Sequence, residues 1–201
     1  MPSERRSPDE LDCDYMNQLH NDLRVLRAVV DEELRRRWDR SLPFADALFD
    51  RWERADQLGF GVGSSVYDSA HVFGSVAVGE ETWIGPFVIL DGSGAALTIG
   101  SHCDVSAGVH IFTHDTALRC VSMGQAGAQR SPVNIGDGTY IGSQSVVTPG
   151  TIIGSRCIVG ANSFVNADVP DRTIVAGSPA VPIGSVEGGG VDVRCVYPTD
   201  Q

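Results

Sequence analysis

His114 and Asp91 are the two side chains of this sequence best suited to acid–base chemistry. His114 opens the segment 115–132, where an otherwise regular repeat is interrupted. An imidazole titrates near neutral pH and can take a proton from an attacking hydroxyl or amine. A histidine that only closes a turn of the repeat is the alternative, and the residues alone leave both open. We expect a functional role because a single break in a repeat is typical of a binding or catalytic loop.

Asp91 lies about one turn of the repeat before His114. Its carboxylate is expected either to orient the imidazole or to bind the acceptor of a transferred group. A structural aspartate that satisfies the amides of a turn is the alternative. Asp115 is a weaker candidate for the same two roles.

The five cysteines indicate structural thiols. They are Cys13, Cys103, Cys120, Cys157 and Cys195. Their number is odd, they lie far apart and no CxxC pair occurs, so we expect neither a disulfide framework nor a zinc site. Cys103 and Cys157 fall at inward positions of the repeat, which disfavours a covalent cysteine intermediate.

Aliphatic residues recur with a period of six from Val66 onward, and this pattern predicts the strands that position His114 and Asp91. Aliphatic residues recur six apart up to Leu90, continue from Ile99 to Ile111 after a slip of three residues, and recur again from Ile135 to Val165. Glycine often follows the aliphatic residue, and the fourth residue after it is usually small or β-branched. Each hexad is therefore predicted to form one short strand and one corner, with three hexads to a coil and about five coils in all.

The first 60 residues follow a helical period instead. Ser7-Pro8-Asp9-Glu10 is typical of a helix start, and apolar residues then recur every three or four positions along one face. These apolar residues are Leu11, Tyr15, Leu19, Leu23, Leu26, Val30 and Leu34. A second short helix is predicted from Phe44 to near Gly59. The predicted organisation is a helical segment (1–60), a repeat domain (61–184) with a loop at 115–132, and a tail (185–201).

Composition and charge exclude several classes of protein. The chain has 201 residues, of which 42% are hydrophobic, and this is typical of a globular domain rather than a disordered chain. The formal net charge is −11 and no lysine occurs, so non-specific nucleic-acid binding is disfavoured. The first residues are charged and no long apolar run follows, so we expect neither a signal peptide nor a membrane span, with the cytoplasm as the default location.

The hexads resemble the [LIV]-G-x-x-[small]-x repeat of left-handed parallel β-helix proteins, over residues 61–184. The family that holds most of these proteins is the hexapeptide-repeat acyltransferases. The resemblance implies an all-β solenoid of the left-handed parallel β-helix class, with an N-terminal α-helical segment. The fold alone does not fix the activity, since enzymes of other kinds share it.

The neighbourhood of His114 is similar to the catalytic segments of galactoside and maltose O-acetyltransferases. The similar segments are Ile89-Leu90-Asp91, Thr98-Ile99-Gly100 and Ile111-Phe112-Thr113-His114. The resemblance implies that His114 is the general base for direct attack on acetyl-CoA, the co-substrate, without an acyl-enzyme. It also implies a homotrimer in which CoA lies between subunits and meets the corners Gly142-Ser143 and Gly160-Ala161. The segment 169–180 resembles the ending that closes the helix in this family.

The basic residues expected to meet the CoA phosphates are missing. Relatives commonly have a lysine or arginine after the last hexad, where this chain has Asn166-Ala167. We place Asn166 at the cofactor site and expect Arg172 to supply the missing charge, with Arg156 and Arg130 as alternatives.

The predicted function is therefore acetyl-CoA-dependent O- or N-acetylation of a sugar or sugar-nucleotide, in the biosynthesis of surface polysaccharides. Serine or an antibiotic as the acceptor, and a non-catalytic scaffold, remain alternatives. A γ-class carbonic anhydrase shares the fold but needs three zinc-binding histidines. The order and surroundings of His71, His102, His110 and His114 do not resemble those ligands, so no metal is expected.

Overall fold

Two units, residues up to Asp50 and residues from Arg51 onward, make up the chain in the computed structural model, which describes residues 13–198. The first unit contains helices α1 (Cys13–Trp38) and α2 (Phe44–Leu48). α1 is a continuous helix of 26 residues with an acid in its first turn and three arginines in its last, charges that complement the helix dipole. The helix start predicted at Ser7-Pro8 lies outside the described residues.

The second predicted helix is divided in the structure. α2 ends at Leu48, and Phe49 has an extended backbone with φ −101° and ψ 134°. A separate helix, α3 (Arg51–Gln57), begins the second unit. None of the helices in the described part of the chain is long and apolar enough to cross a membrane.

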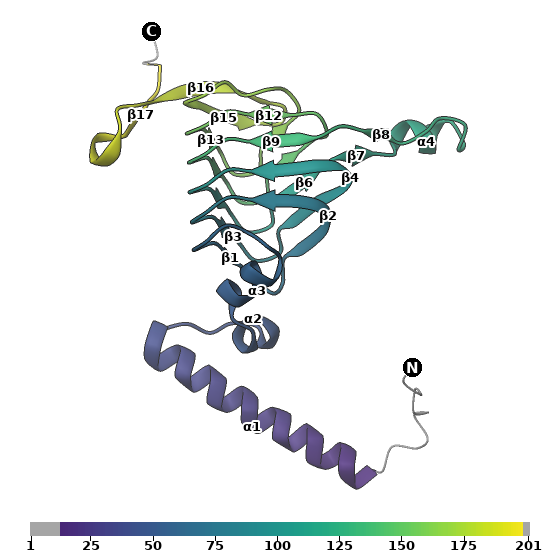
Figure 1. The fold of residues 1–201 in the computed structure, drawn as a ribbon, viewed down its shortest axis with the longest axis vertical. Coiled ribbons are helices and arrows are strands. Elements are labelled where there is room, and N and C mark those ends of the chain that lie inside the picture. The colour runs from purple at the N-terminus through teal and green to yellow at the C-terminus, as the bar shows by residue number, and fades with distance from the viewer. Residues whose placement is uncertain (1–12, 199–201) are drawn as a thin grey trace. The chain divides into compact units, whose positions relative to one another are not determined.

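α3 covers the first coil of the second unit (Figure 1). Arg54 of α3 donates hydrogen bonds to the backbone carbonyls of Tyr67 and Ala70, and its guanidinium lies 3.9 Å from the carboxylate of Asp68. Ala55 on the same helix is buried in the hydrophobic core. The open end of the coil stack is thereby closed by residues that immediately precede it in sequence.

The second unit is a stack of short parallel strands, with three strands in each regular coil (Figure 1). One sheet has the order β1-β3-β5-β10-β13-β15-β16-β17, and the other has the order β12-β9-β4-β6-β11-β14 with β2 paired to β4. The first strands are β1 (Ser65–Val66), β2 (His71–Val78), β3 (Trp83–Ile84), β4 (Ile89–Ile99), β5 (Asp104–Val105), β6 (His110–Phe112) and β9 (Val133–Ile135). The later strands are β10 (Tyr140–Ile141), β11 (Val146–Val147), β12 (Ile152–Ile153), β13 (Ile158–Val159), β14 (Phe164–Val165), β15 (Thr173–Gly177), β16 (Ala180–Glu187) and β17 (Arg194–Val196).

The strand register follows the predicted hexads. Partner residues on adjacent coils are 18 apart in the regular part of the repeat, as for Val66 with Ile84. The separation rises to 21 across the three-residue slip, as for Ile84 with Val105, and to 36 across the 115–132 interruption, as for Val105 with Ile141. Both irregularities therefore leave the coils on either side in the same register, and the arrangement fits a parallel β-helix.

The core is the interior of this stack. The aliphatic residues that start the hexads are buried, with Val72 partly buried at the first coils. Hydroxyl and thiol groups at inward corner positions connect one coil to the next. Thr82, Cys103, Thr139 and Cys157 each donate to a backbone carbonyl of an adjacent coil, at distances between 2.8 and 3.3 Å. The small inward residues of the repeat thus satisfy buried backbone groups as well as fill space.

Antiparallel strands close the other end of the stack. β16 pairs with β15 and β17 pairs with β16, and Val186 on β16 is buried. The predicted tail thus contributes the end of β16, a 3-10 turn at Gly190–Asp192 and β17. Residues 199–201 lie outside the described part of the chain.

We predict that Val147→Ala lowers the free energy of unfolding by about 2 kcal/mol, because it removes buried methyl groups from a closely packed interior. Val147 is fully buried, whereas Val191 is fully exposed. The matched Val191→Ala variant should therefore differ from the parent by less than about 0.5 kcal/mol. Urea unfolding of both variants measures the difference. Equal losses in the two would contradict the assignment of the hexad starts as the core.

Candidate active site

The structure brings His114 and Asp91 together at one edge of the coil stack. Asp91 lies on β4 beside Phe112 of β6, and His114 begins β7 (His114–Asp115) directly beyond β6. Nδ1 of His114 is 3.5 Å from Oδ2 of Asp91. The histidine side chain is one third exposed, and the aspartate side chain is only 12% exposed. A partly accessible imidazole therefore faces a nearly buried carboxylate.

The Nδ1 atom of His114 is the buried side of the imidazole. It has no hydrogen-bond partner among residues 13–198, because 3.5 Å exceeds the usual N–H···O distance. Catalytic hydrogen bonds are often long in structures without substrate and tighten when the substrate binds. Asp91 is positioned to accept a hydrogen bond from Nδ1–H, and the tautomer that carries this proton leaves Nε2 free to act as a base.

The three-residue slip of the repeat is a bulge that holds Asp91. β4 pairs Gly92 with Gly74 and Leu97 with Val76, so residues 93–96 of β4 stand opposite one residue of β2. Ser93 in this bulge donates from its backbone amide and its hydroxyl to Oδ1 of Asp91, at 3.0 and 2.6 Å. Oδ2 is thereby left to face His114. The sequence analysis did not assign Ser93 a role, although the slip in the period marks its position.

Thr113 ties the bulge to the histidine. It is fully buried, and its hydroxyl donates to the backbone carbonyl of Asp91 at 2.7 Å. The same hydroxyl accepts hydrogen bonds from the amides of Gly94 and Ala95. A Cβ atom on Gly94 would lie 2.5 Å from the Cβ of His114, so this position requires glycine for a close approach. Thr113 and Gly94 are thus further residues that the sequence analysis missed.

The interruption after His114 forms an antiparallel ribbon that projects from the stack (Figure 1). β7 pairs with β8 (Gln129–Arg130), and Arg130 stands opposite His114. Directly opposite residues on paired strands present their side chains on the same face. Asp115 accepts a hydrogen bond from the amide of Ala117, at the start of α4 (Ala117–Val121), which gives this carboxylate a local structural contact.

The residues predicted to bind CoA lie on three different edges of the stack. We call these the histidine edge, with Asp91, His114 and Asn166; the glycine edge, with 142–143 and 160–161; and the arginine edge, with Arg156 and Arg172. The glycine edge follows β10 and β13, the histidine edge follows β6 and β14, and the arginine edge follows β12. Only Asn166 among the predicted cofactor residues shares an edge with His114.

Close stacking on the glycine edge explains its residue types. A Cβ atom on Gly142 would lie 2.6 Å from the backbone nitrogen of Ala161, and one on Gly160 would lie 2.9 Å from the Cβ of Ala176. The amide of Asn162 donates to the carbonyl of Ser143. These contacts are structural and account for the small residues on this edge. Gly142 is buried, whereas Gln144 and Ala161 are exposed.

Arg172 is engaged within its own chain. Its guanidinium donates to the backbone carbonyls of Gly188 at 2.9 Å and Val186 at 3.4 Å, which fixes the start of β15 to the end of β16. Arg156 is exposed on the same edge. Of the three arginines considered in the sequence analysis, Arg130 is the one that strand pairing puts beside His114.

The two buried cysteines are poor nucleophiles. Burial raises the pKa of the Cys103 and Cys157 thiols above their ordinary value, despite backbone hydrogen bonds that lower it. A higher pKa leaves less thiolate at neutral pH, and the thiolate is the reactive form. Among residues 13–198, no group of three or more His, Cys, Asp and Glu side chains is arranged to hold a metal ion.

We predict that a small disulfide reagent reacts quickly with three thiols of the folded protein, those of Cys13, Cys120 and Cys195, which are exposed. Cys103 and Cys157 should react at least about 100-fold more slowly until the protein unfolds, because they are buried and protonated. Counting the released thiolate in native and denaturing buffer measures this. Four or five fast thiols in the native protein would contradict it.

We predict that Gly94→Ala displaces His114, because the added methyl group would overlap the Cβ of the histidine. Gly127→Ala is the matched control, since a Cβ atom at Gly127 meets nothing within 4 Å. The ring-proton resonances of His114, assigned by their loss in His114→Ala, should shift in the first variant and stay in place in the second. Unchanged resonances in Gly94→Ala would contradict the proposed contact.

Sequence comparisons find the same repeat. Residues 132–167 match the family model described as bacterial transferase hexapeptide (six repeats). A putative acetyltransferase of Schizosaccharomyces pombe is 33% identical over 93 residues, which cover 46% of this chain and 45% of that protein. A putative colanic acid biosynthesis acetyltransferase of Escherichia coli is 31% identical over 110 residues, 54% of this chain and 57% of that protein. The chain thus spans about half the length of these curated relatives.

Structure comparison extends the likeness over most of the chain. A hexapeptide-repeat-containing acetyltransferase of Vibrio cholerae, crystallised in complex with acetyl-CoA, superposes with a TM-score of 0.52 and 26% sequence identity. The match covers 84% of this chain and 89% of that chain. The repeat, the strand register and these similarities together show that the chain contains the hexapeptide repeat and is similar to hexapeptide-repeat acetyltransferases.

Proposed function

We propose that this protein transfers an acetyl group from acetyl-CoA to a hydroxyl or amine of a sugar or sugar-nucleotide. The observation that carries the proposal is the pairing of a partly exposed His114 with a nearly buried Asp91, 3.5 Å apart. Acetyl-CoA as donor is supported by the complex of the Vibrio cholerae relative. A glycan precursor as acceptor is supported by the relative named for colanic acid biosynthesis.

His114 acts as the general base in the proposed reaction. Its Nε2 takes the proton of the acceptor while the acceptor oxygen or nitrogen attacks the thioester carbon. Asp91 accepts a hydrogen bond from Nδ1–H and stabilises the imidazolium that forms, while Ser93 donates hydrogen bonds to the other carboxylate oxygen. A backbone N–H stabilises the oxyanion. The C–S bond then breaks, and the CoA thiolate takes the proton back from the imidazolium, so the enzyme is regenerated without a covalent intermediate.

The proposed assembly is a homotrimer of left-handed β-helices with one site per interface. Its support is the distribution of the predicted residues over separate edges of one chain. If the histidine edge of one copy faces another edge of its neighbour, the base and the CoA-binding corners meet across the interface. In this arrangement the donor site consists of residues from two copies.

Cations for the CoA phosphates remain scarce in this arrangement. Because the guanidinium of Arg172 is engaged with two backbone carbonyls, Arg156 and Arg130 are the better candidates for an anionic group. Arg130 stands beside His114 in the β7–β8 ribbon, which favours contact with a negatively charged group of the bound substrates. A sugar-nucleotide, with its phosphates, would supply such a group on the acceptor side.

We predict that His114→Ala lowers kcat by a factor of about 10²–10⁴, the usual contribution of a general base, with little change in acetyl-CoA affinity. His102→Ala is the control, because His102 is exposed on the arginine edge and outside the acid–base pair. CoA thiol release with sugars, sugar-nucleotides, serine and antibiotics as acceptors measures activity. Calorimetric titration of acetyl-CoA measures donor binding separately.

Each result of the acceptor series has a definite meaning. Release that depends on a sugar or sugar-nucleotide and disappears in His114→Ala supports the proposal. CoA thiol release only with serine or an antibiotic would support acetyl transfer but contradict a sugar or sugar-nucleotide as the acceptor. Acetyl-CoA that fails to bind at sub-millimolar concentration, together with no release in any mixture, identifies a non-catalytic scaffold.

A further inference from the structure

α1 carries a regular apolar seam, none of whose side chains is buried among residues 13–198. The seam consists of Met16, Leu19, Leu23, Leu26 and Val30, which are spaced alternately by three and four residues. No residue of α1 is buried, and the first four seam side chains are between 38 and 44% exposed. Five apolar residues in this alternating pattern along one helix are typical of the a and d positions of a coiled coil.

The charged residues that flank the seam are complementary to a second copy. With Met16 at an a position, Asp22 falls at g and Arg27 at the following e. In a parallel coiled coil, a g residue lies beside the next e residue of the partner helix, so Asp22 would face Arg27 of a second copy. The next such pair joins Val29 to Leu34, which are both apolar. The Asp22–Arg27 pair is therefore attractive when two copies of α1 lie parallel and in register.

The contacts that these charges make inside α1 are weak and leave them available. Asp22 accepts a hydrogen bond from Gln18, and Arg27 lies 3.8 Å from Asp31, whose side chain is 20% exposed; each pair is four residues apart. Pairs of this kind contribute about 0.3–0.5 kcal/mol. A partner helix that removes Asp22 and Arg27 partly from water would offer a better-defined interaction.

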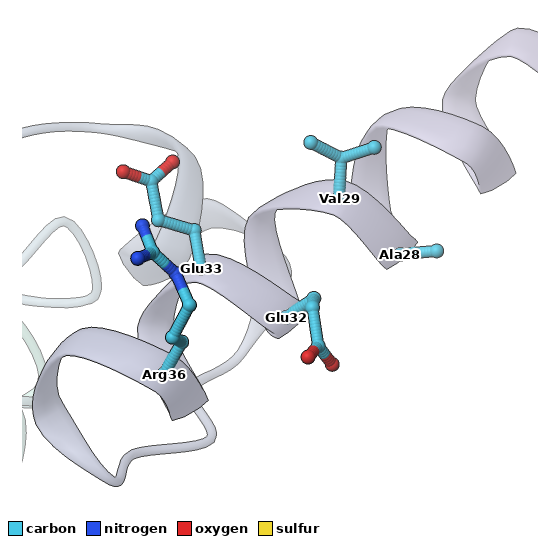
Figure 2. A pocket seen from close by; sticks show the side chains of 5 residues that line it. All are labelled: Ala28, Val29, Glu32, Glu33 and Arg36. Carbon is cyan, nitrogen blue, oxygen red and sulfur yellow. The ribbon is translucent and has the colours of Figure 1, made fainter.

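The seam ends where the helix becomes charged. Figure 2 shows an open hollow on α1 lined by Ala28, Val29, Glu32, Glu33 and Arg36. Glu33 occupies the next d position, and its side chain and that of Arg36 extend to the same side of the helix (Figure 2). The regular a and d pattern of apolar residues therefore ends at Val30, and the seam is limited to residues 16–30.

We propose that α1 associates through this seam, parallel and in register, with α1 of a second copy of this chain. The interaction is separate from the acyltransferase site and does not depend on the proposed activity. It would join copies through residues 16–30 in addition to any contact between their β-helices.

Disulfide trapping in the full-length protein tests the orientation directly. In a background where the exposed Cys13, Cys120 and Cys195 are replaced by serine, Leu26→Cys puts a thiol at a d position. Ala28→Cys, two residues away, puts one on the opposite side of the helix. Under mild oxidation by diamide, we expect the first variant to form covalent dimers at least about tenfold faster than the second. Equal rates, or no dimer from Leu26→Cys, would overturn the proposal.

Exchanging the charges of Asp22 and Arg27 tests the register, and the double variant controls for nonspecific effects of the substitutions. In the Leu26→Cys background, Asp22→Arg and Arg27→Asp should each slow dimer formation about three- to tenfold, because like charges then face each other. The double variant restores opposite charges between copies and should recover the original rate. Failure of the double variant to recover, with helix content unchanged by circular dichroism, would overturn the parallel, in-register arrangement. Protection of the Leu26→Cys thiol without dimer formation would instead assign the seam to another surface.

Discussion

Pairing of each coil with the next, 18 residues further along the chain, is the constraint on which the remaining structure depends. A two-residue strand has few backbone hydrogen bonds of its own, so its amides and carbonyls must find partners on adjacent coils. This requirement fixes which side chains point inward, and the aliphatic residues at those positions then stack through the whole length of the core. Hydroxyl and thiol groups at the corners donate hydrogen bonds to backbone carbonyls that the short strands do not pair.

The close approach of His114 and Asp91 arises where this regular pattern is interrupted twice on adjacent coils. The bulge at 93–96 supplies the hydrogen bonds that hold Asp91, and the excursion after Thr113 begins with His114. The two irregularities stabilise each other. The hydroxyl of Thr113 accepts a hydrogen bond from the amide of Gly94 in the bulge, and Gly94 lacks the Cβ atom that would overlap His114. The departures from the repeat therefore bring the His114–Asp91 pair to one edge of the coil stack.

Sequence alone predicts the strands and their register, because side-chain size at every sixth position decides what fits inside a coil. It also predicts His114 and Asp91 as a candidate pair, because His114 opens the interruption and Asp91 lies about one turn earlier, and their catalytic role stays a prediction. It does not identify Ser93 and Thr113 as partners of that pair, because the path of a bulge depends on hydrogen bonds between coils. The choice of Arg172 rested on charge, and charge does not reveal that its guanidinium is held by two backbone carbonyls. The break between α2 and α3 was likewise missed, because their residues continue a helical pattern across Phe49.

The projecting ribbon also affects the order in which coils can assemble. β11 meets β14 after a chain segment of 18 residues, as Val147 pairs with Val165, but β6 meets β11 only after 36, as Ile111 pairs with Val147. Doubling the length of a loop raises the entropic cost of closing it by about 0.6 kcal/mol. The coils after the interruption can therefore nucleate on one another before they join the coils that precede it. The same small entropic cost means that the ribbon tolerates changes in length and sequence, so that one coil scaffold can present different surfaces beside the same histidine.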